Sequence, residues 1–75
     1  MTNKEKLGIL RYILGPEGKT DWMYDKQNDV FVVFPDDPEE ELRYTEYWTD
    51  GEYILFRDIW NEGHTLTGVA SVGCL

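Results

Sequence analysis

The sequence predicts an α+β fold, with one N-terminal helix packed on a small antiparallel β-sheet of four to five strands. Three observations carry this prediction. An amphipathic stretch opens the chain and ends at a Gly-Pro pair, at residues 15–16. Short segments rich in β-branched and aromatic residues follow, separated by turn sequences. The Asp50-Gly51 pair between two of these segments is a favoured hairpin turn, so the sheet is expected to be a meander.

The length of 75 residues allows one compact domain, residues 1–75. A chain of this size buries only about 60% of the surface that its unfolded form exposes, so its stability is small. Cys74 is the only cysteine, which excludes a disulfide within one chain and favours a reducing compartment. The apolar run after Met1 is short and interrupted by Arg11, which argues against a signal peptide, and no apolar stretch is long enough to span a bilayer. We therefore expect a cytoplasmic protein.

Residues 3–14 are predicted to form the helix. Thr2 or Asn3 can cap its start, and Glu5 lies in the first turn, where the helix dipole favours an anion. Apolar residues at spacings of three and four make one broad face. They are Leu7, Ile9, Leu10, Ile13 and Leu14. The Gly-Pro pair at residues 15–16 ends the helix, because glycine tolerates a left-handed cap and proline cannot continue the hydrogen-bond ladder.

Three segments outside the central hairpin are predicted to be strands. Residues 21–25 form a short strand, and a polar turn at 26–29 separates it from residues 30–34. The sequence Val-Phe-Val-Val-Phe at 30–34 is β-branched or aromatic throughout. Its continuous apolarity predicts burial on both faces, with the helix covering one of them. Pro35 ends this strand, and residues 64–72, rich in Thr, Val and Gly, form the last one.

Residues 38–49 fit two different structures. Asp37 as a cap and Pro38 at the first helical position would begin a helix with three aromatic residues on one side. The alternative is a hairpin closed at residues 50–51, with φ > 0 at both turn positions. We favour the hairpin, with at most one helical turn over residues 38–41.

The hairpin is favoured because a two-residue turn brings suitable side chains opposite one another. The pairs are Thr49 with Glu52, Trp48 with Tyr53, Tyr47 with Ile54, Thr45 with Phe56, Tyr44 with Arg57, Arg43 with Asp58 and Leu42 with Ile59. They combine aromatic with aromatic, apolar with apolar, a guanidinium with a ring, and a base with an acid. Only one pair is poor, with Glu46 opposite Leu55.

The formal net charge of −8 is confined to one third of the chain. Residues 36–62 contain ten acidic side chains against Arg43 and Arg57, whereas the rest of the chain contains five acids and five bases. Anionic lipid and nucleic acid phosphate repel such a surface. We therefore expect no direct binding to nucleic acid or to a membrane.

No motif in the sequence indicates catalysis or a cofactor. His64 is the only histidine, whereas general base catalysis usually needs a second group to orient the imidazole, and Ser71 and Cys74 lack a local activating motif. The acidic run and residues 25–29 do not match the calcium-loop pattern, and no zinc-ligand spacing or phosphate-binding loop is present. The sequence predicts a protein that is not an enzyme and that holds no metal or cofactor.

Aromatic residues make up 15% of the chain, and they have two possible roles. A small core needs large side chains, and we assign most of the aromatic residues to it. The alternative is that some are exposed anchors for a partner, since Trp and Tyr are enriched in interface hot spots.

The acidic stretch and the aromatic residues within it are the candidate partner-binding site. A solvated face that keeps the protein soluble explains negative charge, but not its confinement to one stretch. A hairpin bearing carboxylates resembles a row of phosphates to a basic groove, so we expect a mimic of nucleic acid that blocks the DNA- or RNA-binding site of a basic protein. The protein itself is expected to be a monomer or a weak dimer. The candidate residues are Asp36, Asp37, Glu39, Glu40, Glu41, Glu46, Tyr47, Trp48, Asp50 and Glu52.

In size, acidity and predicted α+β fold, the chain resembles small phage-encoded inhibitors, especially the DNA-mimicking anti-CRISPR proteins. The resemblance is to a class of diverse sequences, so it assigns no role to individual residues. It implies a partner in a bacterial CRISPR-Cas defence complex, competition with target DNA, and action in the host cytoplasm. Two alternatives stay open: an immunity-type inhibitor of a basic nuclease toxin, and a small accessory subunit of a larger assembly.

Overall fold

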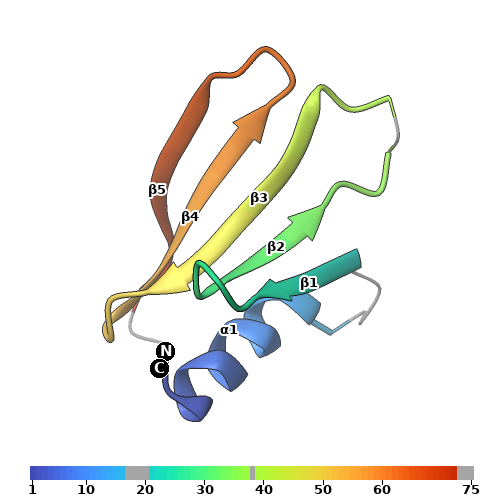
Figure 1. Cartoon of the computed structure of the whole chain (residues 1–75). Helices are drawn as coiled ribbons and strands as arrows, with labels where there is room; N and C mark the ends of the chain where they lie inside the picture. The colour runs from blue at the N-terminus through green and yellow to red at the C-terminus, as the bar shows by residue number, and fades with distance from the viewer. Residues whose placement is uncertain (17–20, 38, 73–75) are drawn as a thin grey trace.

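The computed structural model describes residues 1–16, 21–37 and 39–72, and it confirms the predicted α+β meander (Figure 1). Its elements are α1 (Asn3–Leu14), β1 (Asp21–Asp25), β2 (Val30–Phe34), β3 (Leu42–Thr49), β4 (Tyr53–Trp60) and β5 (Thr65–Val72). The strands form one antiparallel sheet in sequence order. Helix α1 lies against one face, near the β3–β4 turn, so the sheet extends beyond it toward the β2–β3 and β4–β5 connections.

Helix α1 begins and ends where the sequence predicts. The Thr2 hydroxyl accepts a hydrogen bond from the Glu5 N–H (3.1 Å), and the Glu5 carboxylate accepts one from the Thr2 N–H (2.8 Å), which is a complete capping box. At the other end Gly15 has φ 54°, in the left-handed region that glycine adopts readily. Its N–H donates to the Arg11 carbonyl (3.1 Å) and closes the last turn.

The core forms between α1 and the middle of the sheet. Ile9 from α1 and Ile54 from β4 are fully buried, and Phe31 from β2 is 2% exposed. The side chains packed around these three are Met1, Leu10, Ile13, Tyr24, Tyr47 and Ala70. Val32, the next residue of β2, points to the opposite face and is also buried, so each face of β2 has one buried residue, while the other three residues of the strand are half-buried.

The stretch before β4 is a strand, so the helical alternative for residues 38–49 is wrong. Leu42–Thr49 pairs along its length with β4. In the described residues before it, the Glu39 N–H donates to the Asp37 carboxylate (2.9 Å) and the Glu40 N–H to the Asp37 carbonyl (3.1 Å), which forms a turn. Pro38, the expected helix start, lies outside the described residues.

The hairpin prediction is confirmed, but the predicted register is wrong by two residues. Thr49 pairs with Ile54, and Glu46 pairs with Arg57. The shift of two holds from Tyr44 to Thr49 and leaves those side chains on their predicted faces, so the pattern of faces did not reveal the error; Leu42, beyond a bulge, pairs with Trp60, one residue from the prediction. The observed register replaces the one poor pair, Glu46 opposite Leu55, with an ion pair between Glu46 and Arg57 (3.5 Å).

A longer turn than predicted explains the shift. The Asp50 carboxylate accepts hydrogen bonds from the N–H groups of Glu52 and Tyr53 (both 2.9 Å), and the Thr49 hydroxyl accepts one from the Gly51 N–H (3.0 Å). Gly51 has φ 102°, whereas Asp50 does not adopt positive φ, contrary to prediction. Side-chain hydrogen bonds therefore stabilise the observed turn, whereas the predicted two-residue turn would need positive φ at both of its residues.

Gly51→Val should lower the free energy of unfolding by about 1 kcal/mol or more, because a β-branched residue resists positive φ. Glu52→Val is the matched control, since it adds the same side chain at an exposed neighbour that does not have positive φ. Urea denaturation of both variants provides the comparison. Equal free energies of unfolding for the two variants would show that the positive φ of Gly51 does not cause the loss of stability.

Candidate functional site

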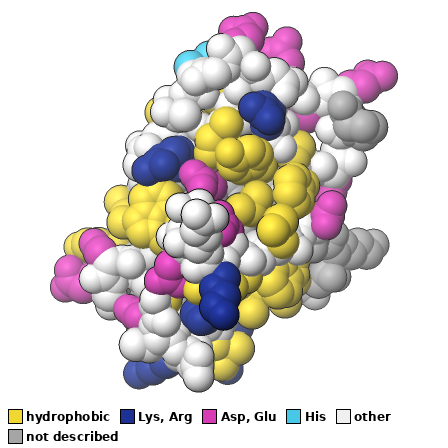
Figure 2. Space-filling view, in the orientation of Figure 1, with side chains coloured by type: hydrophobic (Ala, Val, Ile, Leu, Met, Phe, Trp, Pro, Cys, Tyr) yellow, Lys and Arg dark blue, Asp and Glu magenta, His cyan; other side chains and the backbone are white. Residues whose placement is uncertain are grey.

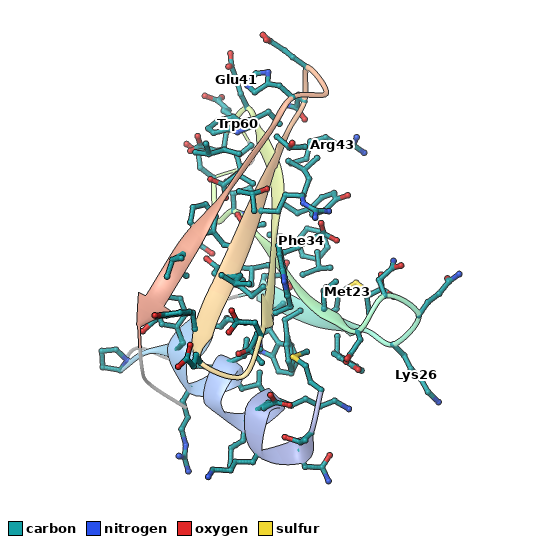
Figure 3. The ribbon with its side chains drawn as sticks, turned by 90° about the vertical axis from the view of Figure 1, so that its left-hand side faces the viewer. Met23, Lys26, Phe34, Glu41, Arg43 and Trp60 are labelled. Atoms are coloured by element: carbon teal, nitrogen blue, oxygen red, sulfur yellow. The ribbon has the colours of Figure 1, made fainter. Side chains whose placement is uncertain are left out.

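Six exposed carboxylates gather at the end of the sheet away from α1, and we call this group the acidic end. It consists of Asp36, Asp37, Glu39, Glu40, Glu41 and Glu62. The β2–β3 connection and the β4–β5 turn lie side by side here, because the Asn61 N–H donates to the Glu41 carbonyl (2.9 Å). Figure 2 shows acidic side chains over these connections, and Figure 3 shows Glu41 at the same end.

Few interactions engage the carboxylates of the acidic end. Asp37 accepts a hydrogen bond from the Glu39 N–H (2.9 Å), and a Glu62 oxygen lies 3.9 Å from His64 Nδ1. The other four side chains form no hydrogen bond or ion pair with any residue that the structure describes. Like charges are therefore concentrated here without an evident role in folding.

A shallow hollow of about 390 Å³ lies beside two residues of the acidic end, Asp37 and Glu40. It is lined by Phe34, Pro35, Asp37, Glu40, Leu42, Arg43 and Asn61. Phe34 packs edge-on against Tyr44, with ring centroids 6.4 Å apart, and both rings are half-buried. The hollow thus combines apolar lining with two carboxylates, and Arg43 is its one cationic residue.

Acidic residues at the opposite end have structural roles. Backbone N–H groups of Tyr53 and Glu52 hold the pKa of Asp50 below its usual value. The backbone N–H of Thr2, followed by its hydroxyl, lowers the pKa of Glu5 in the capping box. These carboxylates stabilise a turn and a helix start, so they are not equivalent to those of the acidic end.

The turn between β1 and β2 uses two further carboxylates. Asp25 accepts hydrogen bonds from the Asn28 side-chain amide (2.7 Å) and backbone, and these lower its pKa. Asp29, with φ 55°, accepts hydrogen bonds from the Met1 amino group and the Tyr24 hydroxyl, and both contacts lower its pKa. The same contact with Asp29 raises the pKa of Tyr24.

The ten predicted site residues do not form one continuous surface. Five of them lie at the acidic end, while Asp50 and Glu52 lie at the other end of the eight-residue strand β3, roughly 25 Å away at the usual strand rise. Glu62 belongs to the acidic end but was not among the predicted residues. Its sequence signal was the Asn-Glu-Gly turn, which the meander brings beside Glu41.

The three remaining predicted residues occupy both faces of β3. Tyr47 packs on the core beside Tyr12 (ring centroids 5.8 Å apart), and burial raises the pKa of its hydroxyl. Glu46 and Trp48 flank Tyr47 in β3 and therefore lie on the face that α1 does not cover. There the Arg57 guanidinium sits 5.3 Å from the centroid of the Trp48 ring and also pairs with Glu46.

Arg57, Glu46 and Trp48 also line a hollow of about 560 Å³ near the β1–β2 turn. Its central charges are already matched, because Glu46 pairs with Arg57 and Asp29 with the Met1 amino group. Four carboxylates of the acidic end have no such partner among the described residues, so we regard it as the stronger candidate.

The other expected features have the following positions. His64 stacks on Trp60, with ring centroids 5.7 Å apart, and its side chain is exposed. Among the described residues, no three His, Cys, Asp or Glu side chains are placed to hold a metal ion, and no helix is long and apolar enough to cross a membrane. Cys74 lies outside the described residues.

Asp50→Asn should reduce the loss of stability in acid. Because the folded pKa of Asp50 is lowered, its contribution is complete above its usual pKa of 3.8 and is lost as pH falls through the lower folded value. Urea midpoints measured from neutral pH to below this value should therefore fall less steeply for the variant than for the parent. A variant that loses stability in acid as steeply as the parent would contradict the role of Asp50.

The chain matches no protein-family model, no curated protein and no solved structure. The acidic end and the hollow beside it are therefore the features of the molecule that bear on its function.

Proposed function

We propose that this chain is a non-enzymatic inhibitor that docks its acidic end on the nucleic-acid-binding site of a basic protein. The observation that supports this function most is the hollow between the β2–β3 and β4–β5 connections. Its lining includes apolar side chains and the carboxylates of Asp37 and Glu40. This combination suits a lysine or arginine side chain, whose stem is apolar and whose head is cationic.

Such a lysine or arginine would contact the hollow with both its hydrocarbon stem and its charged head. The hydrocarbon stem would lie against Phe34 and Leu42, and the ammonium or guanidinium group would reach Asp37 or Glu40. Burial of the stem excludes water from the ion pair, which strengthens a contact that is weak when fully exposed. A protein that binds nucleic acid presents such side chains in a row, where they normally contact phosphates.

The remaining carboxylates of the acidic end would act at longer range. Asp36, Glu39 and Glu41 are exposed and form no side-chain hydrogen bond within the described ranges. Together with the net charge of −8, they produce a negative field that steers a basic partner toward this end. Inhibition then requires only competition for the basic site and no chemical step.

Partner classes with this chemistry include a DNA- or guide-RNA-binding subunit of a bacterial defence complex, which acts in the bacterial cytoplasm. A basic nuclease toxin presents the same kind of surface. Either partner would bind the acidic end in place of phosphates, and the identity of the captured protein distinguishes them.

Affinity capture from a bacterial lysate tests this function. The immobilised parent protein should retain basic nucleic-acid-binding proteins, identified by mass spectrometry, and an excess of duplex DNA or RNA should reduce their capture. A variant with Glu39→Gln, Glu40→Gln and Glu41→Gln is the control, because it retains size and polarity but loses three charges. Capture of the same proteins by both forms, unaffected by nucleic acid, would refute the proposed function.

A further inference from the structure

Strand β5 is an edge strand that carries neither charge nor proline, and its pairing with β4 is irregular only beyond Val69. The other edge strand, β1, has five residues and an aspartate at each end, whereas β5 has eight residues with neither charge nor proline. Natural edge strands are usually short, charged or covered, because their free N–H and C=O groups bind other strands. In the described part of the chain, no segment pairs with the outer side of β5 (Figure 1).

The regular part of this edge is residues 65–69. Beyond it, the pairing with β4 shifts between Ile54 and Leu55, and the Ala70 carbonyl accepts a hydrogen bond from the Tyr12 hydroxyl (3.3 Å). Within the regular part, Leu66 is 57% exposed and Val69 is 52% exposed. These side chains point to opposite faces of the sheet, so both faces of the edge carry exposed apolar surface.

We propose that β5 pairs with β5 of a second copy, antiparallel across a two-fold axis at Thr67, and joins two sheets into one. This register places Leu66 of one copy opposite Gly68 of the other. Gly68 lies under the Phe56 ring, since a Cβ at this position would lie 2.9 Å from Phe56 Cε1. Leu66 of the second copy would cover the side of this ring, and Thr65 would lie opposite Val69 on the other face.

The charge distribution suits a second copy in this orientation. Glu62 precedes β5 by three residues, so the acidic end lies at the start of the strand. Antiparallel pairing puts the acidic ends of two copies at opposite ends of the joined edge, whereas parallel pairing would bring them together. The net charge of −8 on each copy still opposes association, so added salt should strengthen the dimer.

One pair of strands buries less area than the roughly 1,600 Å² of a standard interface, so the dimer should be weak and concentration-dependent. Added salt should strengthen this dimer, whereas it should weaken the binding of the acidic end to a basic partner. The inference therefore does not depend on the proposed function, and the two can fail separately.

Analytical ultracentrifugation from about 10 µM to about 1 mM, at low and high salt, tests the dimer. The parent should form dimers with a dissociation constant that falls as salt rises. Val69→Lys should raise this constant at least about tenfold. Met23→Lys is the matched control, because Met23 is 50% exposed, on the same face but on the β1 edge. Both variants reduce net repulsion equally, so only edge pairing predicts a weaker dimer for Val69→Lys.

A covalent trap tests the register. Thr67→Cys in a Cys74→Ser background should form a disulfide-linked dimer on mild oxidation, because the two-fold axis places the two thiols opposite each other. Met23→Cys in the same background should not, and thermal melting should show that both variants are folded. A parent that stays monomeric throughout, equal dimerisation of the two lysine variants, or larger open-ended oligomers would overturn the proposal; equal cross-linking of the two cysteine variants would overturn its register.

Discussion

Replacing Phe31 with alanine should lower the free energy of unfolding by about 3–5 kcal/mol, the largest effect that we expect from one substitution. Phe31 is 2% exposed and packs with Ile9 and Ile54. Its ring also lies 5.1 Å from that of Tyr24 and 5.8 Å from that of Trp22. Alanine would leave a cavity where α1 meets the sheet and would remove both aromatic contacts.

This loss is comparable to the whole stability of many small domains, which begins at about 5 kcal/mol, so the variant should keep little of its stability. Urea denaturation followed by circular dichroism measures the effect. Leu7→Ala is the control, because Leu7 is 48% exposed on α1 and alanine favours a helix. Its cost should stay below about 0.5 kcal/mol, and similar losses for the two variants would show that the core is elsewhere.

The variant with Glu39→Gln, Glu40→Gln and Glu41→Gln should bind its partner about tenfold or more weakly while folding normally. Each lost charge should contribute a few tenths of a kcal/mol to about 1 kcal/mol, and tenfold corresponds to about 1.4 kcal/mol. Stability should stay unchanged or rise slightly, because removing charges reduces repulsion within the acidic end. Surface plasmon resonance with the captured partner, together with thermal melting, separates binding from folding.

A control with Asp21→Asn and Glu52→Gln removes two charges from outside the acidic end. Both residues are exposed, and their carboxylates form no hydrogen bond or ion pair with the described residues. The control should retain most of the affinity, because these carboxylates would not contact the partner. A similar loss in both variants would mean that net charge alone determines binding, with no role for the acidic end.

Most of the fold followed from local signals in the sequence. Thr2 with Glu5, the Gly-Pro pair at 15–16 and the continuous apolar run at 30–34 placed the helix and β2 with the observed bounds. The register of the hairpin did not follow, because the Asp50 carboxylate forms a longer turn that positional preferences alone do not reveal. The poor match at Glu46 was the one sign of the error, and a shift of two residues resolves it.

The candidate site was predicted only in part. The acidic run at 36–41 was visible in the sequence, but the addition of Glu62 requires the meander to place two connections together. The sequence also could not distinguish carboxylates with structural roles from those without hydrogen bonds. Asp29 and Asp50 stabilise turns through specific contacts, and such contacts depend on backbone conformation.

The most direct test of the acidic end as a binding surface is the association rate with the captured partner, measured as a function of salt for the parent and the variant with three glutamines. Our account predicts that the parent's rate falls steeply as salt rises, because screening shortens to about 8 Å at physiological ionic strength. The variant should start slower and fall less steeply, with a dissociation rate that changes less than its association rate. A parent rate that is flat with salt, or identical slopes for the two proteins, would contradict the account.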